Sequence, residues 1–450
     1  MADAVAGGEI AAPETHGMVP ASLGYRRFAL WLLMLVYIVN FIDRQVVNIV
    51  AEKIKLDLHL SNADIGLISG GVFAIFYTVL GIPIARAAER FSRPLILSGA
   101  MAIWSGFTVL CGLAAGFPQL LLARLGVGFG EAGCTPSAHS MIADDTPAKD
   151  RAYALSFYAM GTPLGAFLGF AIGGVVADAL GWRAAFFVAG APGLLLAIIA
   201  ALTLKEPRRR MAAQAVARPP TPSFATTMAY LFSKPTFWFI ALFAGLSAFV
   251  GYGQNAFITS FYIRNHGPEV EHLAGVFGLK SYGFLGVVGG AIGGLAGAAG
   301  SVIGGRMSDR AGAKDPAAFA TLPALVSILW IPLMIAQVIV PSAAVSLIIS
   351  AAPALLGTFW YGPVYGVAQS VVPPQMRATT AAILLFMINF IGLLFGPPCF
   401  GAFNDYLAGP LGMGQAEGLR WTFVVSCAIV LPAVALLLMA RRSIAKDIVS

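Results

Sequence analysis

The sequence predicts an all-α, polytopic membrane protein with twelve transmembrane helices in two bundles of six. Its 450 residues are 58% hydrophobic and only 11% charged, with a mean hydropathy of +0.82, whereas a soluble chain carries about 25% charged residues. Apolar stretches long enough to cross a bilayer recur along the whole length. They do not alternate apolar and polar residues, which excludes a transmembrane β-barrel.

The apolar stretches divide into two sets of six, separated by a basic, Pro-rich segment that is typical of a solvated linker. The expected spans are 28–50, 64–86, 94–115, 118–143, 152–177 and 183–204, then 236–263, 274–304, 317–340, 343–372, 377–403 and 419–440. The expected domains are a disordered cytoplasmic N-terminus over 1–24, bundles over 25–204 and 236–440, a cytoplasmic linker over 205–235 and a tail over 441–450. The first apolar run is too long for a signal peptide, so we expect no cleavage.

Lysine and arginine placement predicts the orientation. With the N-terminus inside, the cytoplasmic segments hold 20 of the 28 basic residues, and such an excess marks the cytoplasmic side. We therefore expect the protein to lie in the inner (cytoplasmic) membrane of the cell, with both termini in the cytoplasm. The net charge of +7 then reflects topology and contact with membrane lipids, not nucleic-acid binding.

Two loops carry the same pattern in equivalent places. "GRMSDRAGAK" follows the eighth span and "ARAAERFSR" follows the second. The first of these matches the loop signature Gly-x-x-x-Asp-Arg-x-Gly-x-Arg/Lys of the major facilitator superfamily at Gly305, Asp309, Arg310, Gly312 and Lys314. The second is a degenerate copy at Ala85, Glu89, Arg90, Ser92 and Arg93. The chain thus resembles this superfamily over essentially its whole length, and the two halves form the expected parallel repeat.

A narrower resemblance is to Spinster-like transporters. It is carried by "NFIDR" in the first span, "GVGFGEAG" in the fourth and "MIADDTPAKDRAYALSFYAMGTPLGAFLG" leading into the fifth. The resemblance implies alternating access in a monomer, a central cavity lined by spans one, four, seven and ten, proton coupling, and cargo of lysolipid or sphingolipid type. It also implies a conformational latch at the cytoplasmic face, formed by Asp309 and Arg310 and, more weakly, by Glu89 and Arg90.

Four ionisable residues lie deep within spans one and four. Asp43 is 15 residues after Phe28, roughly 22 Å into the first span at about 1.5 Å per residue. In the fourth span Arg124 lies near the level of Asp43. Glu131, two helical turns after Arg124, lies about one turn or more deeper than Asp43, within reach of Arg44. Matching depths predicts an Asp43–Arg124 contact beside an Arg44–Glu131 contact.

These charges are candidates for proton coupling and substrate binding. An ionisable residue within a span costs about 3 kcal/mol even on lenient scales, so a function is the default interpretation; a static charge network joining the two spans is the alternative. A carboxyl group responds both to burial and to a nearby arginine, so a change of conformation can load and release a proton. Glu131 is the first candidate for this role and Asp43 the second, with Arg44 pairing with Glu131 or with an anionic substrate.

The expected inward-facing side chains of the second half are aromatic or carry amides. Lys280 is its only ionisable residue that we expect to reach inward. The candidate cavity residues are Tyr252, Gln254, Asn255, Trp360, Tyr361, Tyr365, Gln369, Phe386 and Asn389. An aromatic half facing a charged half suits an amphipathic organic anion, although plain helix packing explains any single aromatic residue as well.

The sequence therefore predicts a secondary transporter and not an enzyme. It contains no P-loop, no HExxH motif and no nucleophile triad, and we expect no cofactor and no metal, with protons as the coupling ion. The four cysteines lie in apolar runs and are expected to be buried, reduced thiols. A proton-coupled carrier of small organic acids or drugs is the alternative within the transporter class, and a non-transporting membrane receptor is the alternative outside it.

Overall fold

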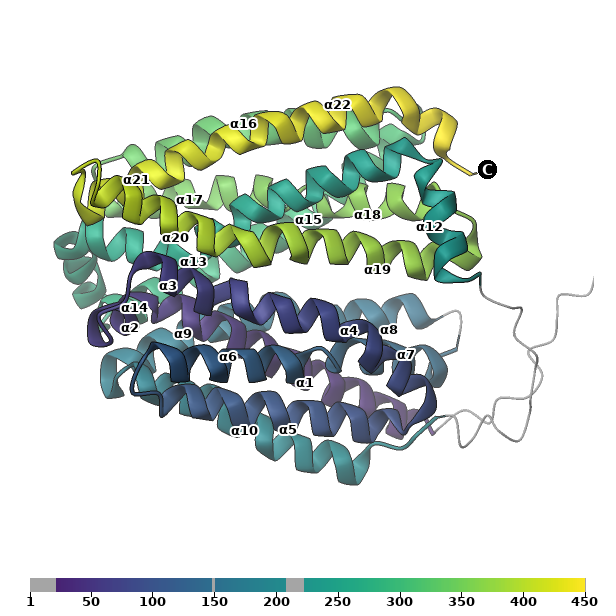
Figure 1. Cartoon of the computed structure of the whole chain (residues 1–450), viewed down its shortest axis with the longest axis horizontal. Coiled ribbons are helices and arrows are strands. Elements are labelled where there is room, and N and C mark those ends of the chain that lie inside the picture. The colour runs from purple at the N-terminus through teal and green to yellow at the C-terminus, as the bar shows by residue number, and fades with distance from the viewer. Residues whose placement is uncertain (1–21, 148–149, 208–221, 450) are drawn as a thin grey trace, which may run out of the picture.

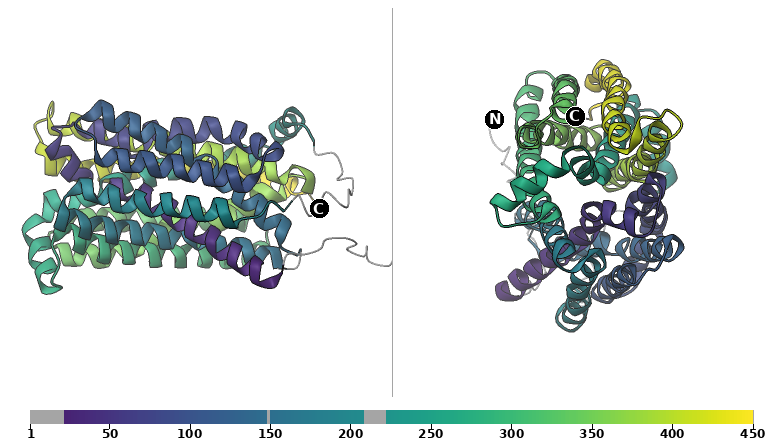
Figure 2. Two further views of the ribbon diagram at one scale, coloured as in Figure 1. Left: turned by 90° about the horizontal axis from the view of Figure 1, so that it is seen from below. Right: turned by 90° about the vertical axis from the view of Figure 1, so that its left-hand side faces the viewer.

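Long helices running side by side build the whole molecule (Figures 1 and 2). The computed structural model describes residues 22–147, 150–207 and 222–449. The N-terminal half contains α1 (Leu23–Ile49), α2 (Ala51–Asp57), α3 (Asn62–Gly66), η1 (Leu67–Gly71), α4 (Val72–Arg90), α5 (Arg93–Gly112), α6 (Phe117–Glu131), α7 (Cys134–Asp145), α8 (Arg151–Ala159), α9 (Gly161–Leu180) and α10 (Trp182–Thr203).

The C-terminal half repeats this plan after a short helix. It contains α12 (Phe224–Phe232), α13 (Pro235–Val276), α14 (Ser281–Phe284), η3 (Leu285–Gly289), α15 (Gly290–Gly312), α16 (Ala318–Ile339), α17 (Ala343–Thr358), α18 (Tyr361–Ser370), η4 (Pro374–Met376), α19 (Arg377–Met387), η5 (Ile388–Leu393), α20 (Leu394–Ala408), α21 (Gly414–Ser426), η6 (Cys427–Ile429) and α22 (Val430–Asp447). Helix α12 lies within the segment expected to be a linker, of which 208–221 are outside the described residues.

The multi-pass membrane fold is confirmed. Eleven helices in the described residues are long and apolar enough to cross a membrane. The remaining expected span, the fourth, consists of α6 and α7, which are separated by a turn at Ala132 and Gly133. Together these elements form the predicted twelve-span bundle, and the fourth helix is interrupted directly after Glu131.

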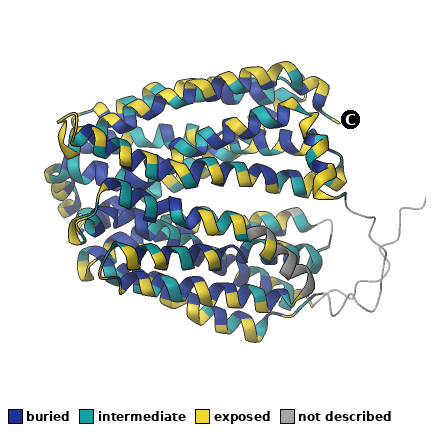
Figure 3. Ribbon diagram, in the orientation of Figure 1, coloured by how far each residue is buried: buried dark blue, intermediate teal, exposed yellow. Residues whose placement is uncertain are grey.

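Figure 1 shows the two halves as separate groups of helices that approach each other at one end. Helix α1 begins and α22 ends at the other end, which we call the terminal end; the opposite end, with α2, α14 and α21, is the distal end. Buried residues gather where the halves meet toward the distal end (Figure 3). The ribbons of α4 and α19 diverge toward the terminal end.

Helix α9 packs directly on α1 through a row of glycines at intervals of four. A Cβ atom at Gly165 would lie 2.5 Å from the carbonyl oxygen of Ile38, and one at Gly169 would lie 2.9 Å from Cα of Ile42. Such distances are shorter than real contacts allow, so only glycine permits this approach. The row thereby fixes α1, which carries Asp43 and Arg44, against the fifth span.

Three expectations from hydropathy are wrong in detail. The seventh span continues as α13 to Val276, across a kink at His266, because helical hydrogen bonding continues through polar residues beyond the apolar stretch. The eighth span therefore begins later than expected, at Ser281, after the turn at Gly278 (φ 68°). Lys280 is exposed at the distal end beside the carbonyl of Asp178 and does not reach inward. Cys399 is exposed on α20, whereas the other three cysteines are buried; all four are free thiols.

Candidate functional site

Arg44 and Glu131 form an ion pair between α1 and α6. Nε of Arg44 donates to Oε2 of Glu131 at 2.6 Å, and the glutamate side chain is fully buried. Three aromatic rings surround the guanidinium, whose central carbon lies 5.3 Å from the ring centroid of Phe41, 4.9 Å from Phe73 and 4.6 Å from Tyr77. Aromatic faces attract a desolvated cation, so these rings hold Arg44 in place without neutralising it.

Asp43 and Arg124 form a second, looser pair beside the first. Nη1 of Arg124 lies 3.7 Å from Oδ1 of Asp43, beyond hydrogen-bond distance, and both side chains are 1% exposed. The other oxygen of Asp43, Oδ2, accepts a hydrogen bond from Thr108 Oγ1 on α5 at 2.6 Å. Both contacts that the depth comparison predicts are therefore present, and Phe73 touches both guanidinium groups.

Asp43 and Glu131 each have one carboxyl oxygen that makes no hydrogen bond within the described parts of the chain. These atoms are Oδ1 of Asp43 and Oε1 of Glu131; Nη1 of Arg124 is likewise without a hydrogen-bond partner there. Buried polar atoms are normally satisfied, and exceptions call for a functional explanation. The unbonded oxygen of each carboxylate is where a proton can be added with the least rearrangement of the arginine paired with it.

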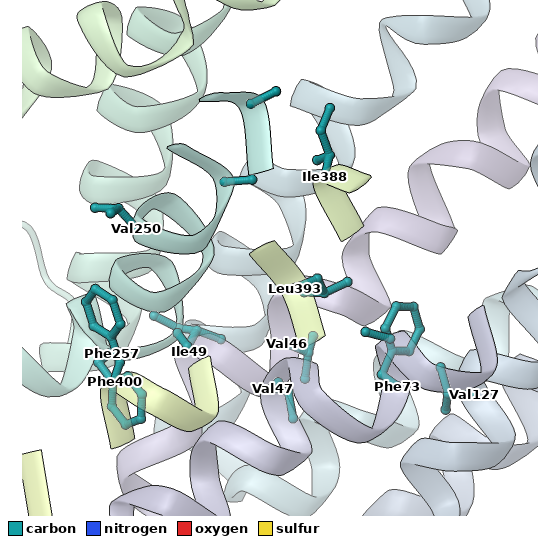
Figure 4. Packing of buried hydrophobic residues seen from close by; sticks show 14 of the residues in the cluster. Val46, Val47, Ile49, Phe73, Val127, Val250, Phe257, Ile388, Leu393 and Phe400 are labelled. Carbon is teal, nitrogen blue, oxygen red and sulfur yellow. The ribbon is translucent and has the colours of Figure 1, made fainter. Parts of the chain in front are cut away.

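Buried hydrophobic residues surround the two pairs on every helix that carries them. Val46 and Val47 on α1, Phe73 on α4 and Val127 on α6 belong to one cluster, to which Leu393 of the C-terminal half contributes (Figure 4). A low-dielectric surrounding strengthens electrostatic interactions, so a change in charge at either pair has a large effect on its neighbours.

The structure brings some of the candidate cavity residues to the interface between the halves. Nδ2 of Asn255 on α13 donates to Oε1 of Gln45, the residue after Arg44, at 3.1 Å. Tyr252, Tyr361 and Tyr365 are partly exposed. On α18, the rings of Tyr361 and Tyr365 are parallel, with centroids 6.5 Å apart.

Other candidates have partners within the C-terminal half. Gln254 donates to Ser426 at 3.2 Å, and Asn389 donates to the carbonyl of Leu385. Trp360 is buried and stacks on Tyr361, whereas Gln369 and Phe386 are exposed. Gln254, Asn389 and Trp360 are thus engaged within the C-terminal half itself.

The latch residues lie at the terminal end. Asp309 and Arg310 are exposed at the end of α15, and neither side chain has a hydrogen bond or ion pair to another described residue. The side chains of Glu89 and Arg90 are outside the described residues. The acid and the arginine of the complete loop signature are thus unpaired with other described residues in this conformation.

A buried cluster around Arg93 was not predicted. Its guanidinium is fully buried and forms ion pairs with Glu206 at 2.5 Å and Asp144 at 2.7 Å, while the backbone N–H of Arg93 also donates to Glu206. This cluster joins the starts or ends of α5, α7 and α10 at the terminal end. Its arginine belongs to the degenerate loop signature, but the two acids are far away in sequence, so only the fold reveals them.

A second unpredicted network closes the distal end between the halves. Arg264 on α13 binds both carboxylate oxygens of Glu52 on α2, at 2.9 and 2.6 Å, and also donates to Asn62. Asp405 on α20 accepts hydrogen bonds from the backbone N–H groups of Asn62 and Ala63. The hydrogen bonds that join the halves within the described residues all lie in the middle or distal part of the bundle.

The architecture and the buried charge pairs define a class of protein, the multi-pass secondary transporters with two repeated bundles. The model of the Major Facilitator Superfamily matches residues 33–397, and the chain belongs to this superfamily. It is a Spinster-like member, as the sequence indicates, and its family is one of transporters and not of enzymes.

Two relatives and one solved structure illustrate this similarity. An MFS-type efflux pump of Mycolicibacterium smegmatis is 30% identical over 92% of each chain. Protein spinster homolog 1 of Xenopus laevis is 31% identical over 50% of this chain and 43% of its own length. A crystal structure of a bacterial homolog to the human lysosomal transporter Spinster, in an inward-facing and unoccupied conformation, matches with a TM-score of 0.86 and 33% identity, covering 96% of this chain and 100% of that one.

Proposed function

We propose that the protein moves a hydrophobic or amphipathic organic anion of lysolipid or sphingolipid type across the membrane by alternating access, coupled to protons. The observation that carries this proposal is the pair of buried acid–arginine contacts, in which Glu131 and Asp43 each keep one unbonded oxygen. Glu131 is the principal proton carrier and Asp43 the second. Arg44 exchanges its carboxylate partner for the anionic group of the substrate.

The proposed orientation places the terminal end in the cytoplasm of a cell whose inner membrane holds the protein as a monomer. The excess of lysine and arginine in the segments at that end supports it. The distal network then closes the outer side, and the unengaged Asp309 and Arg310 belong to an open inner side. This assignment agrees with the inward-facing conformation of the solved bacterial homolog.

The different side chains that the two halves contribute support a lipid-like substrate. Charged groups lie on α1 and α6, whereas the facing α13 and α18 supply Tyr252, Tyr361 and Tyr365. A molecule with an anionic group and an apolar body can contact both sides at once. The sequence similarity to Protein spinster homolog 1 supports the same class.

A carrier of small organic acids or drugs is the second candidate. It is favoured by the efflux pump of Mycolicibacterium smegmatis, whose similarity extends over nearly the whole of both chains. The same charge pairs can bind the anionic group of either substrate. The two substrate classes therefore differ in how much apolar surface they need to contact in the protein.

Flux in proteoliposomes under an imposed pH gradient tests the proposal. We expect uptake of a lysolipid to be driven by the gradient and to disappear when an ionophore dissipates it. Gradient-driven uptake of small organic acids or drugs, with no lysolipid flux, would favour the second candidate. If folded protein transported neither lysolipids nor small organic acids or drugs, proton-coupled transport would be overturned and the receptor interpretation would remain.

A further inference from the structure

The second span is interrupted by a π-helical segment, η1, close to both buried ion pairs. The N–H of Val72 donates to the carbonyl of Leu67, five residues back, where an α-helix would use the residue four back. Such segments are rare and occur mainly at functional positions. Because they change the direction of backbone carbonyls, they can offer an oxygen to a neighbouring side chain.

The same segment lies against the end of a second π-helical segment, η5, and the start of α20 in the other half. A Cβ atom at Gly70 would lie 2.6 Å from the carbonyl oxygen of Leu393, the last residue of η5, and 2.8 Å from Cγ of Pro397. One at Gly66 would lie 2.2 Å from the carbonyl of Pro397. Gly66 lies in α3 and Pro397 in α20, so the close approach begins before η1 and continues beyond η5; we call the contacts of Gly66 and Gly70 with Leu393 and Pro397 the η1–η5 seam.

Arg124 connects the charge cluster to this seam. Its Nε donates to the carbonyl oxygen of Ile68, within η1, at 3.0 Å. Its Nη1 points to Asp43 at 3.7 Å without forming a hydrogen bond. In the conformation with a closed distal end, the guanidinium is therefore bonded to η1, which forms one side of the seam, and is only loosely paired with Asp43.

We propose that Arg124 is a positioning residue that couples the charge of Asp43 to the opening of the η1–η5 seam. The guanidinium is a rigid, planar group with donors in fixed directions. A hydrogen bond to ionised Asp43 requires Nη1 to move closer, and this movement draws Nε away from Ile68. Neutral Asp43 exerts no such pull, so Arg124 stays on Ile68 and the distal end stays closed.

Asp43 does not act in isolation. The charged and titratable groups that face it are Arg44 beside it on α1, Arg124 and Glu131 on α6, and Cys111 on α5. Arg44 is bonded to Glu131 at 2.6 Å and held by aromatic rings, so the cation that changes partner in the proposal is Arg124, which is bonded to the Ile68 carbonyl and lies 3.7 Å from Asp43. This inference rests on the proposed alternating access and adds the route by which a proton changes the conformation.

A double-mutant cycle on a distance readout tests the coupling. Two bioorthogonal fluorophores are placed at His59 and Leu411, exposed residues on opposite halves at the distal end, and their separation is measured in nanodiscs without substrate or gradient. We expect Asp43→Asn, which removes the charge, to raise the ratio of closed to open distal ends about fivefold or more. In an Arg124→Lys background, the same substitution should change the ratio by less than about twofold.

The inference is overturned if Asp43→Asn shifts the ratio equally with and without Arg124, or does not shift it at all. Gly70→Ala supplies a second test that leaves the arginine intact, because its Cβ meets the seam, with Gly289→Ala in η3 as the control, where a Cβ meets nothing within 4 Å. We expect only Gly70→Ala to open the distal end and to suppress the effect of Asp43→Asn. An equal effect in both glycine variants overturns the inference. The proposed transport is tested separately, by the flux measurements in proteoliposomes.

Discussion

Nε of Arg44 lies 2.6 Å from Oε2 of Glu131, although the residues are 87 positions apart and on different helices. The contact stands at the point where α6 ends and a turn separates it from α7. The two residues of this turn, Ala132 and Gly133, keep right-handed helical backbone angles (φ −56°, ψ −25° and φ −86°, ψ −15°), and Gly130 and Gly133 flank Glu131 without a side chain. Glycines on both sides permit close packing and movement of the helix, which is the reason for choosing Glu131 as the principal proton carrier.

Glu131→Gln is expected to abolish pH-driven flux and to leave the protein folded. The amide keeps the size of the side chain and can still accept a hydrogen bond from Arg44, but it cannot take up a proton. Flux in proteoliposomes should fall to that of empty liposomes, while gel filtration and thermal stability remain those of the parent. Lys280→Gln, at an exposed cation of the distal end, serves as the control; wild-type flux in Glu131→Gln would remove Glu131 from the proton route.

Arg44→Ala is expected to abolish coupled flux and to destabilise the protein. It leaves Glu131 buried without its cation, and breaking a buried pair by removing one partner costs about 3–5 kcal/mol. The melting temperature should fall, and raising the proton concentration should restore part of the loss because protonation neutralises Glu131. A melting temperature that is lowered equally at every pH would show that packing on Phe73 and Tyr77, and not the charge, accounts for the effect.

Arg264→Ala is expected to open the distal end. It removes a bidentate contact between two side chains that are each 7% exposed, and the remaining Glu52 is then more stable in an open, hydrated conformation. The distance between labels at His59 and Leu411 should shift to the longer population. The exchanged pair Glu52→Arg with Arg264→Glu should restore the shorter one; an unchanged distance in Arg264→Ala would mean that the glycine contacts alone close this end.

Asp309→Asn is expected to reduce flux without lowering stability. In this conformation the side chain is exposed and has no hydrogen bond to another described residue, so its replacement should change the free energy of unfolding by less than about 0.5 kcal/mol. As a latch, it acts only when the terminal end closes. A large fall in melting temperature, or full flux at a normal melting temperature, would contradict the latch role.

Gly165→Val is expected to lower stability by separating α9 from α1. A Cβ at this position would lie 2.5 Å from the carbonyl of Ile38, and overpacking of this kind costs about 1–3 kcal/mol. Thermal unfolding in detergent measures the effect. Gly99→Val on α5, where a Cβ meets nothing within 4 Å, should be nearly neutral, and equal losses in both variants would show that helix propensity is responsible.

The charge pairs could be predicted because depth in a membrane is a one-dimensional quantity. Counting residues from the ends of the first and fourth spans brings Asp43 level with Arg124, and the long side chain of Arg44 reaches Glu131. The loop signature and the twelve spans were equally accessible, since each depends on local spacing or hydropathy. The end of the seventh span was not, because polar residues beyond the membrane continue the helix.

The sequence by itself determined the class, the two repeated halves and the pairing of four intramembrane charges, because hydropathy and helical geometry set these with little help from packing. Only the tertiary structure decided which end is closed, through Glu52 and Arg264, and that Arg124 bonds the carbonyl of Ile68. Those contacts join segments far apart in the chain and depend on how two halves meet. A backbone carbonyl turned by a π-helical segment leaves no pattern of residue types, so it appears only when the helices are packed together.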